Sequence, residues 1–232
     1  MRRRSFFGIF FALSAGLAAA GAGNLSRDGH AAGLDELVTA ARNPAAIFGS
    51  IEISSSSFKA LPQWARVLES MQSELPAYRS CLRDSGDCQT AGQKSWRKVI
   101  SAATGLGRRE KLRMVNKFFN TWPYKYDQEL YGVTEYWANL TEFLRRSGDC
   151  EDYSIAKYYA LKELGFTSDE MRIIILLDEI RNIGHAVLAV YIDDEILILD
   201  SLSDLVLPHS MYKHYVPQYS MNETRRWAHI TG

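Results

Sequence analysis

Cysteine is scarce in this chain, and an excess of charge of either sign is absent. Among 232 residues there are three cysteines, and 27 basic side chains balance 27 acidic ones. A neutral composition gives no electrostatic argument for nucleic-acid binding, so no nucleic-acid partner is expected. Long apolar runs are also missing after residue 22, so no later segment is predicted to span a membrane.

The first residues have the layout of a secretory signal. Arg2–Arg4 form a basic start, an apolar run follows from Phe6 to about Ala20, and small residues come after it. The run is short for a membrane span, which needs about 20 apolar residues. We therefore predict a signal peptide at residues 1–22 and export of the mature chain. A retained membrane anchor is the alternative, and the paired arginines also permit twin-arginine export.

The three cysteines divide by their spacing. Cys81 and Cys88 are seven positions apart, on either side of a turn-forming Arg-Asp-Ser-Gly sequence. An exported protein meets an oxidising compartment, so these two are predicted to form a disulfide and Cys150 is left as the free thiol. The tetrapeptide Ser-Gly-Asp-Cys ends at both Cys88 and Cys150. The first copy is thus expected to be structural and the second to carry the reactive sulfur.

Helices are expected first along the chain and strands later. Apolar residues recur at helical spacing in three segments, residues 57–75, 107–122 and 134–146. A fourth helix is predicted from Cys150 to a stop at Gly165. Three strands are predicted, at residues 171–177, 184–191 and 195–200, with the last two joined as a hairpin. This order predicts an α+β domain with an antiparallel sheet at residues 58–232, preceded by an extended leading segment at residues 23–57.

Cys150 stands where the fourth helix is predicted to begin, whereas Cys88 precedes Gln-Thr-Ala-Gly-Gln, a poor helix start. Unpaired backbone N–H groups and the positive end of the helix dipole stabilise a thiolate at such a position. A lowered pKa is what a nucleophilic cysteine requires. The structural alternative is a small buried hydrophobic residue.

A base and an orienting acid are predicted on the hairpin. His185 opens one strand and Asp200 ends the next. If the loop has an even number of residues, centred on Asp193-Asp194 or one position earlier, both side chains lie on one face. Asp200 is then directly or diagonally across from His185. Together with Cys150 they make a plausible triad, although either residue could instead be purely structural.

Three acids surround the predicted nucleophile, namely Asp149, Glu151 and Asp152. One interpretation is that these acids interact favourably with the positive end of the helix dipole. The other is that they bind a cation, because unneutralised carboxylates next to the cysteine would raise the pKa of its thiol and oppose catalysis. Oxygen ligands of this kind suit Ca²⁺. The aromatic segment Asn120–Asp127 is interpreted as core or groove wall, with Trp122 as a candidate neighbour of the cysteine.

The residues just described resemble the bacterial transglutaminase-like cysteine proteinases, in particular the LapG-type periplasmic proteases. The resemblance runs from about Trp64 to the end and is strongest in three segments, residues 147–165, 184–191 and 196–202. It implies a papain-like, transglutaminase-type core and a triad of Cys150, His185 and Asp200. It also implies calcium bound by acids beside the nucleophile, which correspond to Asp149, Glu151 and, with less support, Asp152.

The resemblance further implies a substrate and a partner. Proteases of this kind act in the periplasm on a large surface adhesin, which they cut near its N-terminus at a di-alanine site, and the cut disperses biofilm. The periplasmic domain of an inner-membrane cyclic di-GMP receptor sequesters them. The residues alone leave other readings open: a transglutaminase or cell-wall peptide amidase with the same triad, or a non-catalytic binding module with a structural cysteine.

Overall fold

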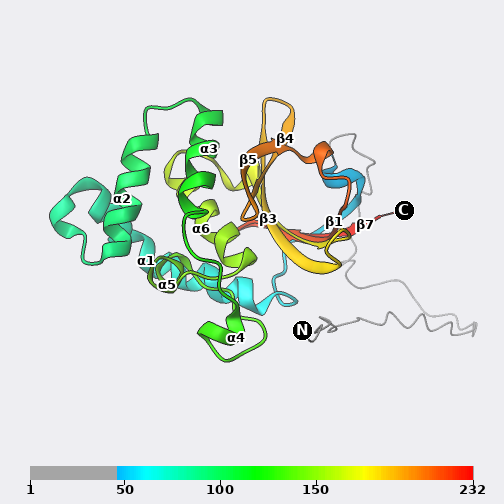
Figure 1. The fold of residues 1–232 in the computed structure, drawn as a ribbon, viewed down its shortest axis with the longest axis horizontal. Helices are drawn as coiled ribbons and strands as arrows, with labels where there is room; N and C mark the ends of the chain where they lie inside the picture. Colours follow the sequence, from blue (N-terminus) through cyan, green and yellow to red (C-terminus); the bar gives the residue numbers. More distant parts are fainter. Residues whose placement is uncertain (1–45, 232) are drawn as a thin grey trace, which may run out of the picture.

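The computed structural model describes residues 46–231, which form a layer of helices beside a seven-stranded sheet (Figure 1). The helices are α1 (Pro62–Arg83), α2 (Ala91–Ala103), α3 (Arg108–Phe119), α4 (Asp127–Leu130), α5 (Leu140–Arg146) and α6 (Cys150–Glu163). The strands are β1 (Ile51–Ser55), β2 (Met171–Asp178), β3 (Ile183–Ile192), β4 (Glu195–Asp200), β5 (Ser203–Pro208), β6 (Tyr215–Met221) and β7 (Arg226–Ile230). Short 3₁₀ turns are η1 (Ile47–Gly49), η2 (Ser85–Asp87), η3 (Ser168–Glu170) and η4 (His209–Met211).

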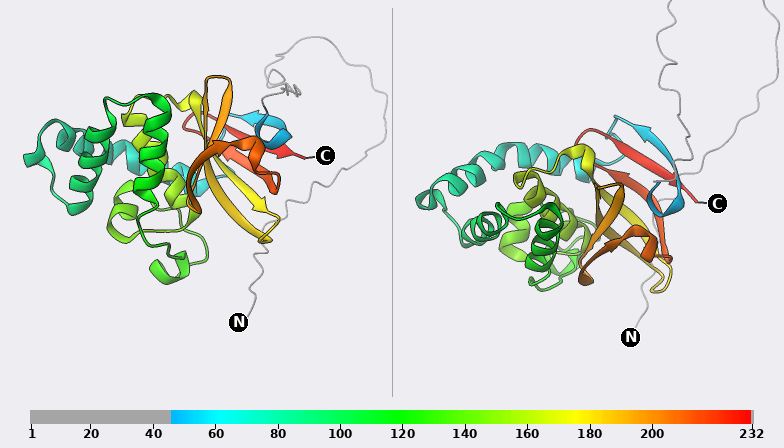
Figure 2. Two further views of the ribbon diagram at one scale, coloured as in Figure 1. Left: turned by 45° about the horizontal axis from the view of Figure 1, so that its top comes forward. Right: turned by 90° about the horizontal axis from the view of Figure 1, so that it is seen from above.

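The sheet is antiparallel throughout, in the order β1-β7-β6-β2-β3-β4-β5. Figure 2 shows the helices gathered on one side of this strongly curved sheet. The predicted α+β class, with helices before an antiparallel sheet, is confirmed. The three predicted strands are β2, β3 and β4, and the other four strands were not predicted.

The sheet also includes part of the predicted leading segment. Ile51–Ser55 pairs with β7 at the other end of the chain, so a domain boundary at residue 58 leaves out a strand of the sheet. The predicted signal peptide and residues 23–45 lie outside the described residues. No helix within residues 46–231 has the length and apolar character needed to cross a membrane.

Three helix predictions differ from the structure in detail. The first predicted helix, residues 57–75, is α1, which begins at Pro62 and continues to Arg83. The segment after Cys88 does begin a helix, α2, because Thr90 accepts a hydrogen bond from the Gln93 N–H and the Gln93 side chain accepts one from the Thr90 N–H, both 3.1 Å long. This reciprocal cap satisfies N–H groups that the polar sequence alone did not reveal. The third predicted helix begins at Leu140 rather than at residue 134, since Asn139 provides a similar cap there.

The predicted disulfide between Cys81 and Cys88 is present, with the Cα atoms 4.6 Å apart. It joins the last turn of α1 to the residue after η2. A closed loop of this length restricts the unfolded chain and stabilises the fold by about 2–3 kcal/mol. Cys150 is the free cysteine of the described chain, as predicted.

Helix α6 lies in the core. Every residue from Cys150 to Leu161 is buried, because the other helices cover one side of α6 and β2 and β3 cover the other. A helix that is buried on every side must pack against other elements on every side, and α6 does so between the other helices and the sheet. The predicted nucleophile therefore begins an element that is fixed on several sides.

The hairpin of β3 and β4 has the register on which the predicted base–acid pair depends. Ile192 pairs with Glu195, so the loop is the two residues Asp193-Asp194, and both have positive φ, 50° and 60°. This is the backbone of a type I′ turn, which matches the twist of the two strands. Leu188 pairs with Leu199, and Asp200 is therefore diagonal to His185 on the same face.

Candidate active site

The loop before α6 places Cys150 through an unusual backbone. Ser147 has a positive φ of 69°, and its hydroxyl donates to the carbonyl of Pro123. The carbonyl of Gly148 accepts from the Lys125 N–H at 2.9 Å. Position 148 has no room for a side chain, because an added Cβ would lie 2.0 Å from Oδ2 of Asp152. The glycine of this Ser-Gly-Asp-Cys copy is thus required by close packing against the helix start.

The first Ser-Gly-Asp-Cys copy has no such constraint. At Gly86 the nearest atom to an added Cβ is Oδ1 of Asp84, at 3.4 Å. Asp84 caps the 3₁₀ turn by accepting from the Gly86 N–H at 2.8 Å, and the copy ends in the disulfide. The two copies share a sequence, but the first ends in a disulfide and the second in a free thiol.

His185 and Asp200 form a buried pair. Nε2 of His185 is 2.9 Å from Oδ1 of Asp200, and the two residues are 5% and 1% exposed. The Tyr215 hydroxyl donates to Oδ2 of Asp200 at 2.7 Å, and the Leu202 N–H donates to Oδ1 at 3.0 Å. Burial alone would raise the pKa of Asp200, but these hydrogen bonds and the nearby imidazole hold it below its usual value.

This arrangement selects the tautomer of the imidazole. An ionised carboxylate only accepts hydrogen bonds, so Nε2 of His185 carries the proton and Nδ1 has the free lone pair. The strand that carries His185 is also one of those against which α6 packs. Tyr215 was not predicted from the sequence, because its contact depends on β6 pairing with β2 and on the turn before it rather than on any local motif.

The sulfur of Cys150 interacts first with its own neighbour. The thiol donates to Oε2 of Glu151 at 3.1 Å, and no hydrogen bond within the described part of the chain joins it to His185. Burial raises the pKa of the thiol well above its usual value, and the charges of Glu151 and Asp149 raise it further, against an opposing hydrogen bond from Tyr124. Burial and the acidic neighbours therefore outweigh the lowering of the thiol pKa that is expected at a helix start.

Three carboxylates converge beside this sulfur. Asp127, Asp149 and Glu151 each present an oxygen within 4.8 Å of the other two. Oδ1 of Asp127 and Oδ1 of Asp149 are buried without a hydrogen-bond partner. Burial raises the pKa of Asp149, and the charge of Glu151 raises it further. Burial also raises the pKa of Glu151, with the charge of Asp152 adding to it, and burial raises the pKa of Asp127 to about 6. Unpaired buried oxygens fit a bound cation, and an all-oxygen set suits Ca²⁺.

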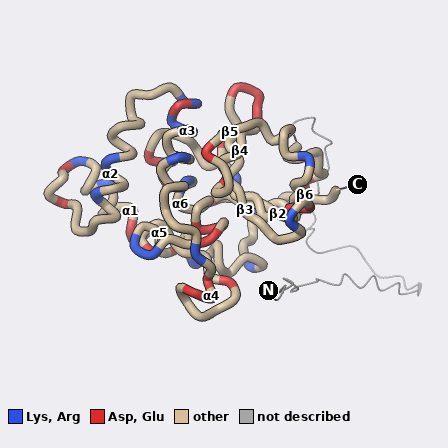
Figure 3. Tube along the Cα trace, viewed as in Figure 1, with Lys and Arg blue, Asp and Glu red and all other residues tan. Residues whose placement is uncertain are grey.

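The cluster differs from the predicted set by one residue. Asp152 uses Oδ1 to accept from the Ala138 N–H at 2.6 Å and Oδ2 to accept from the Asp149 N–H at 3.2 Å. It therefore fixes the helix start, while Asp127 at the beginning of α4 takes the third place in the cluster. Figure 3 shows the acidic residues around α4. Asp127 lies 22 positions before Asp149, and no sequence motif connects the two, so Asp127 was not predicted as a metal ligand.

The aromatic neighbour of the cysteine also differs. Trp122 is partly buried and packs against the core, next to Phe118, Phe119 and Phe143. Tyr124, two residues later, lies against the Cys150 sulfur and stacks on Tyr153. The aromatic segment is thus core at its start and part of the site at its end.

Comparison with known proteins agrees with this geometry. Residues 70–232 match the sequence profile of the bacterial transglutaminase-like cysteine proteinases. Similar solved structures include Legionella pneumophila LapG, with 32% identity over 65% of this chain and 87% of that chain and a TM-score of 0.56. None of the curated proteins matches significantly. The chain belongs to this proteinase family. It is a cysteine protease, and the binding-module reading is set aside.

Two further structures of LapG bear on the acidic cluster of the protease. Calcium-bound LapG from Legionella pneumophila is 32% identical, with a TM-score of 0.57, over 65% of this chain and 87% of that one. EGTA-treated LapG gives the same identity and TM-score over 66% of this chain and 86% of that one. A calcium-bound form therefore exists for a protein whose fold this protease shares.

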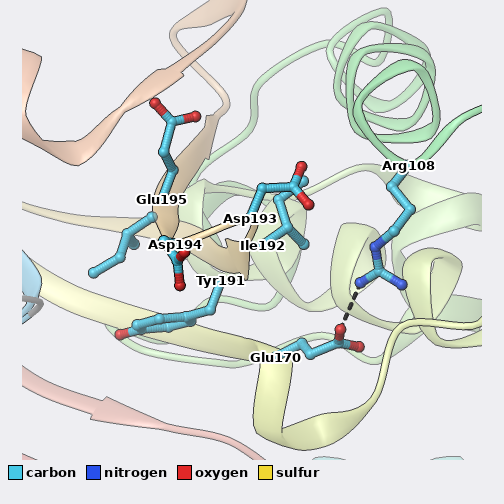
Figure 4. A pocket seen from close by; sticks show the side chains of 8 residues that line it. Arg108, Glu170, Tyr191, Ile192, Asp193, Asp194 and Glu195 are labelled. Carbon is cyan, nitrogen blue, oxygen red and sulfur yellow. Dashed lines mark hydrogen bonds and ion pairs between the residues drawn. The ribbon is translucent and has the colours of Figure 1, made fainter.

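A surface hollow of the protease lies away from these residues. It has a volume of about 640 Å³ and is formed at the β3–β4 turn by Tyr191, the acidic residues Asp193–Glu195 and an ion pair of Arg108 with Glu170, 2.6 Å long (Figure 4). His185 is at the opposite end of β3, about 25 Å away along the strand. The hollow is therefore separate from the candidate active site.

Proposed function

We propose that the protease is a calcium-dependent endopeptidase that acts through Cys150, His185 and Asp200. The observation that carries this proposal is the buried pair of His185 and Asp200 on a strand against which α6 packs, with Cys150 at the first position of α6. A nucleophile at a helix start, a base and an acid that orients the base are the three parts of a thiol protease site.

The chemistry is acyl transfer to sulfur. Nδ1 of His185 takes the proton of Cys150, and the sulfur attacks the peptide carbonyl carbon. The backbone N–H of Cys150, at the start of α6, donates to the oxyanion that forms. His185 then gives its proton to the leaving amine, and it later deprotonates the water that hydrolyses the thioester. Asp200 holds the imidazole in the required tautomer throughout.

Asp127, Asp149 and Glu151 would hold the calcium ion. When bound, it would neutralise the carboxylates that raise the pKa of the Cys150 thiol. The same residues would then no longer repel one another in the buried cluster, so occupancy should also stabilise the fold. Asp152 contributes by shaping the loop through its two backbone contacts.

We further propose that the protease works in the periplasm, where it cuts a large surface adhesin near its N-terminus at a di-alanine site and so releases it and disperses biofilm. The periplasmic domain of an inner-membrane cyclic di-GMP receptor is the proposed regulator. Family membership and the signal-like N-terminal residues support this part of the proposal. The predicted cleavage of residues 1–22 belongs to the same proposal.

A peptide test addresses the chemistry directly. The mature protein is incubated with a peptide containing two adjacent alanines, in calcium or in EGTA, and the products are identified by mass. We expect cleavage after an alanine in calcium, little in EGTA, and none from Cys150→Ala. A Cys81→Ser/Cys88→Ser variant is the control, because those sulfurs lie outside the site.

The same assay separates hydrolysis from transfer to an amine. A primary amine added in excess competes with water for the thioester. A protease releases the free acid with the amine present, whereas a transglutaminase gives the amide as main product. Full cleavage by Cys150→Ala would contradict the proposed nucleophile.

A further inference from the structure

A buried lysine on α6 has no role in the chemistry described so far. Lys157 follows Cys150 by two helical turns and is 1% exposed. Its Nζ donates to Oδ1 of Asn120 at 2.8 Å, and within residues 46–231 it forms no ion pair. Burial lowers the pKa of Lys157 to about 7, against the attraction of Asp200 and Asp204. A cation kept in the core at this cost requires an explanation beyond packing.

The partner of Lys157 is attached to the residue that orients His185. Asn120 ends α3, and its Nδ2 donates to the backbone carbonyls of Asp200 and Ser203, both at 3.0 Å. Asn116, one turn earlier in α3, donates to the same Ser203 carbonyl at 2.8 Å. The turn between β4 and β5, where the strand register is irregular, is thus held by two amides from α3.

Lys157 and the two backbone carbonyls hold opposite ends of the Asn120 amide. An ammonium group only donates, so it must meet the oxygen of the amide. The NH₂ group of Asn120 is then directed to the carbonyls of Asp200 and Ser203. The two carbonyls favour this orientation even without Lys157, but the amide then loses the contact that joins its oxygen to α6.

We propose that Lys157 and Asn120 are positioning residues that fix the Asp200 turn relative to the helix that carries Cys150. One hydrogen bond joins α6 to Asn120, and the next joins Asn120 to the backbone of Asp200. Because the Asp200 carboxylate in turn holds His185, this chain of contacts sets base and nucleophile relative to each other. A displacement of about 1 Å at a reacting group can cost 100-fold in rate. The inference rests on the proposed catalytic roles of these three residues.

A purely structural lysine makes a different prediction. Replacing a buried charge with an apolar side chain of similar volume is often neutral or stabilising. Lys157→Met should therefore fold with an unchanged or higher melting temperature, and a structural role predicts unchanged catalysis as well. A positioning role predicts that kcat falls by about tenfold or more while KM stays within about twofold, since only the reacting geometry is disturbed.

The experiment compares Lys157→Met with two other variants in calcium. Asn120→Asp keeps an oxygen for Lys157 but removes the donors to the Asp200 and Ser203 carbonyls, so it should show the same fall in kcat. Lys162→Met is the matched control, because Lys162 lies on the same helix and contacts Glu223 instead. It should keep the kcat of the unmodified protein.

A second readout needs no substrate. The Nε2 proton of His185 is protected by its hydrogen bond to Asp200 and should give a proton NMR signal in the unmodified protein. We expect the signal to broaden or vanish in Lys157→Met and Asn120→Asp and to persist in Lys162→Met. If the unmodified protein cuts no peptide, the proposed function fails, and the NMR signal still decides the positioning role.

The inference is overturned if folded Lys157→Met or Asn120→Asp keeps both kcat and the Nε2 signal, or if Lys162→Met loses them equally. Should Lys157→Met fail to fold, Asn120→Asp decides by the same two measurements. Should Asn120→Asp also fail to fold, the lysine–asparagine contact is structural and the positioning role is rejected.

Discussion

The thiol of Cys150 donates its hydrogen bond to Oε2 of Glu151, the next residue in the chain, at 3.1 Å. A carboxylate in this position stabilises the protonated thiol, which is the unreactive form. The same carboxylate belongs to the acidic cluster with Asp127 and Asp149. One side chain therefore connects the state of the sulfur to whatever occupies the cluster.

Calcium is expected to speed the alkylation of Cys150 by iodoacetamide. Well below the pKa of a thiol, each unit by which that pKa falls raises the thiolate fraction about tenfold. Glu151→Gln removes one of the charges that raise the pKa, so in EGTA it should react faster than the unmodified protein and respond less to calcium. Glu163→Gln, at the other end of α6, is the control. Slower alkylation of Glu151→Gln in EGTA would contradict this account.

Asp127 should make the calcium-free protein less stable as the pH rises. Its folded pKa of about 6 lies above the usual value near 3.9, so the folded state binds the extra proton. The contribution is fully present below about pH 4 and is lost as the pH rises through 6. Asp127→Asn should reduce the loss between pH 4 and 7 by an amount of the order of 1 kcal/mol, measured by urea unfolding in EGTA. If Asp127→Asn lost stability more steeply than the unmodified protein over this pH range, the effect could not be assigned to Asp127.

Tyr215→Phe should lower kcat through Asp200. The hydroxyl donates to Oδ2 of Asp200 at 2.7 Å, and its loss removes one of the contacts that keep the pKa of that carboxyl low. We expect a severalfold lower kcat and a loss of about 1 kcal/mol in unfolding free energy. Tyr212→Phe is a close control, because Tyr212 stacks on Tyr215 but its hydroxyl is buried without a partner. Equal effects of both variants on kcat would rule out this role for the Tyr215 hydroxyl.

The two Ser-Gly-Asp-Cys copies should respond differently to the same substitution. Gly148→Ala places a methyl group 2.0 Å from Asp152 and should cost about 1–3 kcal/mol, with slower alkylation of Cys150 as the helix start shifts. Gly86→Ala meets nothing closer than 3.4 Å and should change stability by less than about 0.5 kcal/mol. Denaturant unfolding measures the stability of both variants. Similar losses of stability in the two variants would contradict this prediction.

The sequence predicted the parts of the site that depend on local pattern. Cys150 at a helix start follows from the residues on either side of it, and the His185–Asp200 pair follows from strand alternation and a two-residue turn. The disulfide was predicted from the spacing of the two cysteines and from the expected export of the chain. In each of these cases the contact is made between neighbouring segments.

The parts that were missed depend on contacts between distant segments. β1 becomes a strand because β7, nearly 180 residues later, supplies its hydrogen bonds. Asp127 reaches the cluster because the chain from α4 to α5 folds back onto the start of α6, where Asp152 binds Ala138. The thiol pKa is set by burial, which short-range pattern does not report.

The Asp193-Asp194 turn lies about 25 Å along the strands from His185, yet it decides whether the pair forms. Side chains alternate between the faces of a sheet, so one residue inserted in the turn would move β4 by one position and send Asp200 to the opposite face. All three proposed catalytic residues would still be encoded, and the imidazole would lose its partner. For this hairpin, loop length is as much a heritable determinant of activity as the identity of any side chain in the site.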